Sequence, residues 1–272
     1  MNHNQGPYNN QGYQNYPPAQ GYAQPYGQPQ GYGADVHGNY DADTGYYEGD
    51  ISQPAVAAFA KRVYTYFASA LLAATGASVG GIFLTEHFLA TGNVSAFSGM
   101  RIGSLVAFFG SFLAVIFMRK AHTPLKTGLL YVFATACGFM IAPMLTFFMQ
   151  AGMGMSIAFA FGIATVVWGG ITVYVHTTGK DFRGLGGYLF AGLILVLGLV
   201  LMNIFIPFPD TVSRLIMAAV LVIFVGYTLY DTSQVTRDYY HRNDAVGAAM
   251  MLFYDFFILF KYILYFLGGS RD

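Results

Sequence analysis

Beyond residue 62 the chain alternates long apolar stretches with short polar ones. Seven apolar runs of about 17 to 23 residues follow one another, the length that a helix rising about 1.5 Å per residue needs to cross roughly 30 Å of hydrocarbon. The second run is the shortest, and its extension back through Ser98 would bring Arg101 to the membrane interface. Gly76 and Gly80 form a GxxxG pattern, which suits close packing of membrane helices. We predict spans over Val63–Leu84, Ile102–Met118, Thr127–Met149, Ser156–Val175, Leu185–Ile206, Leu215–Val235 and Ala245–Leu267.

The composition agrees with a bilayer as the solvent of this chain. Of the 272 residues, 55% are hydrophobic and 10% are charged, against about 25% charged residues in soluble domains. The formal net charge is zero, which argues against a nucleic-acid partner because phosphates require a basic surface. The single cysteine, Cys137, provides neither a disulfide nor a cysteine-based metal site. We therefore predict an all-α, polytopic membrane protein.

Residues 1–54 differ in composition from the rest. They are rich in Asn, Gln, Gly, Pro and Tyr and contain no Lys or Arg, and such a segment buries too little apolar surface to fold. The triplet QGY recurs at Gln11, Gln20 and Gln30, a polar and aromatic repeat of a kind that can self-associate. A secretory signal peptide is not expected, because a basic start and a short apolar core are missing. We predict a disordered tail over residues 1–54, either an arm that gathers partners or a solvated extension, and a seven-helix domain over residues 55–272.

Basic residues collect on one side of the predicted seven-span path. Nine of the thirteen Lys and Arg residues fall on the side of the amino terminus, three fall on the other side, and Lys261 lies inside the last span. Cytoplasmic loops of membrane proteins are enriched in Lys and Arg. We therefore predict that the amino terminus is cytoplasmic and that the carboxyl terminus lies on the outer side.

Two aspartates lie inside predicted spans. An ionised carboxylate that faces lipid costs several kcal/mol, so an acid within a span usually faces the protein interior and marks a proton or ion path. Asp231 precedes Arg237 by six residues, which puts it about 9 Å from the inner surface of the membrane. Asp255 lies ten residues beyond Ala245, about 15 Å from the same surface. The short loop between the last two spans makes them antiparallel neighbours. The two carboxyl groups can therefore meet, and Arg119 ends the second span on the same side of the membrane.

A carboxylate pair in such a place has specific electrostatics. Two carboxylates about 4 Å apart repel by roughly 4 kcal/mol at an effective dielectric constant of about 20. We expect the pair to share one proton near neutral pH and to titrate as a unit, so that its change of charge can switch a helix contact. The alternative is structural, in which one aspartate caps a broken helix turn or pairs with Arg119 and has no further role.

Enzymatic readings fit the sequence poorly. Tyr230-Asp231 and Tyr254-Asp255 resemble the arrangement of intramembrane aspartyl proteases, but that family requires GxGD, and LFYDFF has no glycine and no following Pro-Ala-Leu stretch. HExxH, GxSxG and phosphate-binding glycine loops are missing as well. Four histidines lie in loops or at span ends without paired metal spacing: His87, His122, His176 and His241. We expect no enzymatic activity and no bound cofactor.

Four segments and the final SRD resemble the Bax inhibitor-1 family: TTGKDFRGLGG, MNIFIPF, GYTLYDTSQV and LFYDFFILFKYILYFLGG. The likeness runs from about Arg62 to Asp272. It implies seven helices, with two outer layers around a central last helix, and in bacterial members a pH-dependent Ca²⁺ leak with a di-aspartyl pH sensor. By motif the sensor falls on Asp231 and Asp255, which would also be weak, transient Ca²⁺ ligands. The arginine that locks the closed state in the family matches Arg119.

A second bacterial branch of the family shares TTGKDFRGLGG and the final SRD, lacks the paired aspartates, and is known for modulating a membrane-bound protease. The paired aspartates favour a pH-sensitive Ca²⁺ leak channel in the bacterial inner membrane, with Ca²⁺ as the permeating ion and the lipid bilayer as its surroundings. The alternative is a non-transporting regulator of a membrane protease or another membrane complex. Unlike some members, this chain has no acid within Ile102–Met118, which leaves cation capture at the outer side unexplained.

Overall fold

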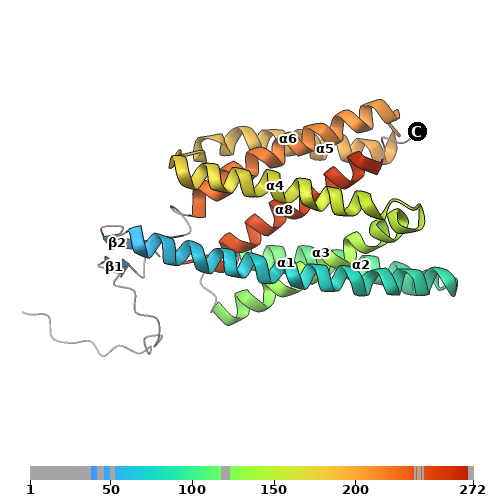
Figure 1. The fold of residues 1–272 in the computed structure, drawn as a ribbon, viewed down its shortest axis with the longest axis horizontal. Coiled ribbons are helices and arrows are strands. Elements are labelled where there is room, and N and C mark those ends of the chain that lie inside the picture. The colour runs from blue at the N-terminus through green and yellow to red at the C-terminus, as the bar shows by residue number, and fades with distance from the viewer. Residues whose placement is uncertain are drawn as a thin grey trace, which may run out of the picture. The chain divides into compact units, whose positions relative to one another are not determined.

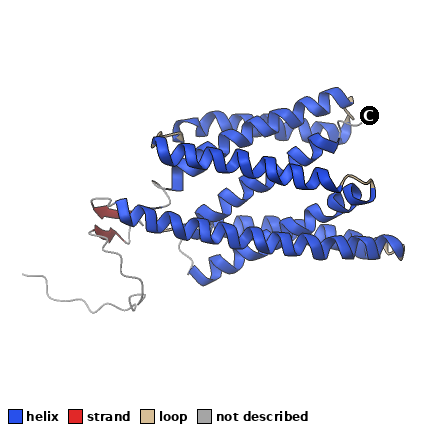
Figure 2. Cartoon of the chain, viewed as in Figure 1, coloured by secondary structure: helices blue, strands red, loops and turns tan. Residues whose placement is uncertain are grey.

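The computed structural model describes residues 38–41, 46–49, 53–117, 123–235, 237, 240 and 242–268. Within the predicted tail, it describes a short antiparallel pair of strands, β1 (Gly38–Asp41) and β2 (Tyr46–Gly49). The rest of the described chain is helical (Figure 2), with a short 3-10 turn, η1 (Arg183–Leu185), before α5. The long helices are α1 (Gln53–Ala90), α2 (Val94–Phe117), α3 (Thr123–Gln150), α4 (Gly154–Thr178), α5 (Gly186–Phe205), α6 (Asp210–Val235) and α8 (Ala245–Gly268).

Each of the seven predicted spans corresponds to one of these helices, and each helix is long and apolar enough to cross a membrane. The predicted fold class is therefore confirmed. The helices α1, α3 and α4 extend beyond the apolar runs at both ends, and α2 and α6 do so at their starts, because hydropathy marks the lipid-facing part of a helix while its hydrogen bonds continue into the interface. Helix α5 is one residue shorter than its run at each end. At α2, the side chain of Asn93 accepts a hydrogen bond of 3.0 Å from the Ala96 amide, a capping interaction that starts the helix at Val94. Arg101 consequently lies two turns inside α2 and not near its first residue.

The helices form two outer layers with α8 between them. Figure 1 shows α1, α2 and α3 on one side and α4, α5 and α6 on the other, while α8 crosses the space between the layers. In agreement with this view, α8 contacts α1, α3, α4 and α6. In the most apolar stretch of α8, 50% of the residues are buried, whereas in the corresponding stretch at α5 only 6% are buried. The arrangement that the family resemblance implied, with a central last helix, is the one observed.

The close approach of α1 and α3 depends on Gly138. A Cβ atom at this position would overlap the carbonyl oxygen of Ala74 and lie 2.8 Å from the Cβ of Ala77. Gly76 and Gly80, by contrast, have open space where a Cβ would lie. The expectation that this GxxxG pattern marks a close helix contact was wrong. A small residue permits close packing only where another helix faces it, and the pattern alone does not show which helix face is covered.

We predict that Gly138→Val destabilises the purified protein in detergent, because the added side chain must push α1 and α3 apart. Overpacking of this kind costs typically about 1–3 kcal/mol, which should appear as a lower midpoint in a thermal unfolding measurement. Gly76→Val is the matched control and should unfold near the temperature of the parent protein. Equal midpoints for all three proteins would show that Gly138 does not set the distance between the two helices.

Candidate functional site

The structure brings Asp231 of α6 and Asp255 of α8 together. Their carboxyl groups are close enough for a hydrogen bond with each other, although the two residues are 24 positions apart in the chain. Asp255 is 2% exposed and Asp231 is 8% exposed. An ionised carboxylate can only accept hydrogen bonds, so the contact requires a proton on one of the two groups. The arrangement can therefore hold a proton inside the helix bundle.

Few polar groups compensate the burial of this pair. The side-chain amide of Gln234 donates a weak hydrogen bond of 3.4 Å to Oδ1 of Asp231. Oδ2 of Asp255 and Oγ1 of Thr232 are buried without a hydrogen-bond partner. Within the described part of the chain, no Lys, Arg or His side chain forms an ion pair with either aspartate. Unpaired buried acceptors are rare and costly, so a proton or a cation is the natural complement of these oxygens.

An aromatic wall lies beside the pair. The ring of Tyr254, which precedes Asp255 in the chain, lies 5.7 Å from the Phe224 ring of α6. It also lies 6.0 Å from the Phe108 ring of α2 and 6.2 Å from the Phe133 ring of α3. These rings make the surroundings of Asp255 apolar on that side, and a low local dielectric strengthens the electrostatic coupling between the two carboxyl groups.

The third predicted site residue, Arg119, lies outside the described residues, as does the segment that joins α2 to α3. Its role as a latch therefore stays a prediction. The sequence analysis assigned no role to Lys126 or Asp244. The structure instead joins them, with Nζ of Lys126 3.1 Å from Oδ2 of Asp244 and side chains only 7% and 16% exposed.

The Lys126–Asp244 ion pair fixes the beginning of α8. Oδ1 of Asp244 accepts a hydrogen bond of 3.0 Å from the Gly247 amide, so the same carboxylate caps α8 and binds the first turn of α3. Negative charge at a helix amino terminus is stabilising. An aspartate directly before the predicted start of the last span was the available sequence signal for the cap. Its cationic partner depends on how α3 and α8 meet and could not be read from the chain.

The loop motif TTGKDFRGLGG is held against the end of α6 that carries Asp231. The Phe182 amide donates a 3.2 Å hydrogen bond to the hydroxyl of Ser233, two residues after Asp231. The guanidinium of Arg237 donates to the Gly179 carbonyl at 3.0 Å, and its Nε lies 3.7 Å from Oδ2 of Asp181. Two of the segments that carry the family resemblance are therefore in direct contact.

Asp181 remains ionised through the range in which a carboxyl pair would titrate. Hydrogen bonds from Arg183 lower the pKa of Asp181 from 3.8 to about 2. A carboxyl group with a lowered pKa stabilises the folded state at pH values above the pKa that it has in the unfolded chain. This contribution is lost as the pH falls toward the pKa that the group has in the folded protein. The side chain is 41% exposed, so solvent screens the effect. A pH response between about pH 8 and pH 5.5 therefore does not originate at Asp181.

Seven apolar helices in two layers around a buried last helix, with an acid pair between two of the helices, define a polytopic membrane protein. The family model described as inhibitor of apoptosis-promoting Bax1 matches residues 56–272. The chain belongs to this family, the Bax inhibitor-1 family, which confirms the resemblance seen in its sequence.

Several bacterial proteins are similar to this chain. A protein of Campylobacter jejuni is 33% identical over 211 residues, which cover 76% of this chain and 86% of the relative. A membrane protein of Vibrio cholerae is 31% identical over 195 residues, with 68% and 86% covered. The modulator of FtsH protease YccA of Escherichia coli is 33% identical over 172 residues, with 62% and 75% covered, and its counterpart in another strain is named an inner membrane protein.

We predict that Lys126→Met destabilises the protein, because it leaves the Asp244 carboxylate nearly buried without its cation. Removal of one partner of a buried ion pair costs about 3–5 kcal/mol, measurable as a lower unfolding midpoint in detergent. The double variant Lys126→Met with Asp244→Asn should recover part of the loss, and Lys61→Met at an exposed position of α1 should have little effect. Equal destabilisation by Lys126→Met and Lys61→Met would contradict a stabilising role of the pair.

Proposed function

We propose that this chain is a non-enzymatic protein of the inner (plasma) membrane that regulates another membrane complex, with a membrane-bound protease as the first candidate partner. The observation that carries this proposal is the likeness to the Escherichia coli protein named a modulator of FtsH protease. The likeness extends over 172 residues, too long to reflect a shared span or two. We keep the amino terminus in the cytoplasm, an orientation that the distribution of basic residues supports. With this orientation Asp231 would lie nearer the cytoplasmic side and Asp255 near the middle of its helix.

The regulator proposal is tested by reconstituting the full chain with an FtsH-type membrane protease in the same proteoliposomes. We expect the two proteins to purify together from detergent extracts. We also expect the rate at which the protease degrades a membrane-embedded substrate to change when the chain is present. The control is an equal molar amount of an unrelated seven-helix membrane protein, which corrects for crowding of the bilayer. Failure to co-purify, together with an unchanged degradation rate, would contradict the proposal.

A second candidate function, a pH-sensitive Ca²⁺ leak, is favoured by the Asp231–Asp255 contact. On this candidate the pair is both the pH sensor and a weak, transient Ca²⁺ site. Ca²⁺ prefers about six to eight oxygen ligands, and no group of three or more His, Cys, Asp or Glu side chains converges among the described residues. Backbone carbonyls, water and hydroxyls such as that of Thr232 would have to complete the shell. Low affinity follows, as suits a permeating ion.

The physics of the pair sets the direction of gating on this candidate. An arginine stays charged throughout the accessible pH range, so Arg119 as a latch would hold the pair while at least one carboxylate is ionised and release it when both are neutral. The open state then binds more protons than the closed state, and acid opens the path. A shift of the ratio of open to closed molecules from 1:99 to 99:1 requires about 5.5 kcal/mol of differential stabilisation. One titrating pair supplies only part of that, so a graded response is expected.

For this second candidate, we predict that Asp231→Asn or Asp255→Asn abolishes the pH dependence of Ca²⁺ flux in liposomes that contain only the purified chain. Each change removes the like charge to which the partner carboxyl group responds, while asparagine keeps the shape of the side chain. Ca²⁺ entry is measured with an enclosed indicator between about pH 8 and pH 5.5, a range in which a solvent-exposed carboxyl group would not titrate.

Asp210→Asn, at the exposed start of α6, is the matched control for this measurement and should keep the pH profile of the parent chain. The absence of flux from the purified parent chain would eliminate the leak and leave the regulator. Flux with a parental pH profile in either asparagine variant would remove the sensor role from the pair.

A further inference from the structure

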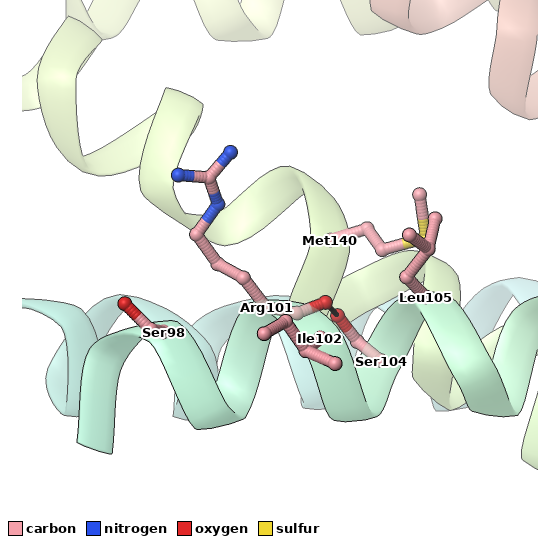
Figure 3. Close-up of a pocket in the computed structure, with 6 residues that line it drawn as sticks. All are labelled: Ser98, Arg101, Ile102, Ser104, Leu105 and Met140. Atoms are coloured by element: carbon pink, nitrogen blue, oxygen red, sulfur yellow. Dashed lines mark hydrogen bonds between the residues drawn. The ribbon is translucent and has the colours of Figure 1, made fainter. Parts of the chain in front are cut away.

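Arg101 lies toward the end of the bundle opposite the Lys126–Asp244 ion pair. It lies two turns inside α2, and its side chain lines two adjoining crevices. The smaller crevice, of about 360 Å³, lies between α2 and α3 and is also lined by Ser98 and Met140. The larger, of about 570 Å³, is lined by residues of α2, α3, α6 and α8. Figure 3 shows the guanidinium extending away from α2 on the side on which the Ser98 hydroxyl also points.

The remaining lining of the larger crevice is apolar or aromatic. It includes Phe97, Met144, Phe147, Met217 and Tyr265, and among residues 53–117, 123–235 and 242–268 no acidic side chain lines either crevice. The Arg101 guanidinium lies over the Phe97 ring, 5.8 Å from its centre. Among the described residues it forms no ion pair with a carboxylate. A permanent cation thus lies at the edge of an apolar space without an anion to match it.

A second cation lies near the same crevice. Nζ of Lys261, inside α8, is 6.0 Å from the centre of the Tyr265 ring, and that ring lines the crevice. Lys261 is partly buried. Two positive charges on different helices therefore approach one apolar space, which gives the space an electrostatic preference for an anionic ligand.

The place of the crevice in the fold indicates the source of that ligand. Its lining residues include Phe147 and Met153, at the junction of α3 and α4, and Gly268, the last residue of α8. These positions lie at or near helix ends, where lipid headgroups are found, and the long side chain of Arg101 can reach toward that depth from two turns inside α2. Ile102 and Phe147 are 63% and 65% exposed on the outside of the helix bundle, as is usual for apolar side chains that contact lipid. A ligand can therefore enter from the bilayer, with a polar part at Arg101 and an apolar part in the crevice.

We propose that this crevice, lined by residues that include Arg101, Met144 and Tyr265, binds one phospholipid with an anionic headgroup. The headgroup phosphate accepts hydrogen bonds from the guanidinium of Arg101, a planar donor that matches phosphate geometry, and from the nearby hydroxyl of Ser98. One acyl chain occupies the crevice, whose volume lies within the roughly 300–1,000 Å³ of small-molecule sites. The proposal does not depend on the function of the aspartate pair.

The test uses the purified full chain in detergent and counts bound lipid by native mass spectrometry during titration with phosphatidylglycerol, phosphatidylcholine or inorganic phosphate. We expect tight binding of one phosphatidylglycerol and weaker binding of phosphatidylcholine. Arg101→Gln should weaken the binding of phosphatidylglycerol by about tenfold or more, as for loss of one charge-assisted hydrogen bond. Arg214→Gln is the matched control, because Arg214 is exposed near the start of α6 and lines neither crevice.

Three results would overturn the proposal. The first is equal affinity of the parent chain for the two lipids, and the second is unchanged phosphatidylglycerol binding by Arg101→Gln. The third is competition by inorganic phosphate at the affinity of the lipid, which would assign the site to a soluble anion. If Arg101→Gln does not fold, Arg101→Lys with Ser98→Ala replaces it. This variant keeps the charge but lacks the planar donor and the hydroxyl, and it should bind phosphatidylglycerol more weakly than the parent does.

Discussion

The burial of two carboxyl groups against each other is the constraint on which the rest of this structure depends. Asp231 and Asp255 lie on different helices, and both are almost fully removed from solvent. Two ionised carboxylates cannot share such a place at acceptable cost, because their repulsion adds to the desolvation of each. The cost of the pair therefore depends on how closely α6 and α8 hold the two side chains together, and a proton shared between them would lower it.

Contacts at one end of the bundle supply that positioning. The Lys126–Asp244 ion pair and the cap on Gly247 fix the start of α8, ten residues before Asp255. The contact of Phe182 with Ser233 and those of Arg237 with the α4–α5 loop fix the end of α6, next to Asp231. The start of α8 is therefore held by a contact with α3, and the end of α6 is held by contacts with the α4–α5 loop of its own layer. These contacts fix the helix ends that carry the two carboxyl groups, so they are the described polar contacts on which the spacing of the pair depends most directly.

The sequence was sufficient for the spans and for the meeting of Asp231 with Asp255. A bilayer forces every backbone group of a span into helical hydrogen bonds, so hydropathy and a fixed rise per residue give both the helices and the depth of each acid. The contacts between helices could not be obtained in this way. Gly138 and the Lys126–Asp244 pair depend on which helix faces meet, and sequence periodicity does not fix this in spans that are apolar on all sides.

Inside the bundle, the aspartate pair and Arg101 provide charges of opposite sign at different places, and this affects the two candidate functions differently. A cation that moved toward the aspartate pair from the far end would approach Arg101 and Lys261, whose positive charge raises its free energy at that end. The second span contributes no negative charge beside Arg101 to offset them, and the described acids on that side, Glu86 and Asp210, lie near the ends of α1 and α6. An anionic headgroup on Arg101 would supply that charge, so a leak through this chain would depend on the lipid composition of the membrane as well as on pH. A regulator that acts through helix contacts has no such requirement. Ca²⁺ movement that depends on anionic lipid is therefore expected only if the aspartate pair belongs to an ion path.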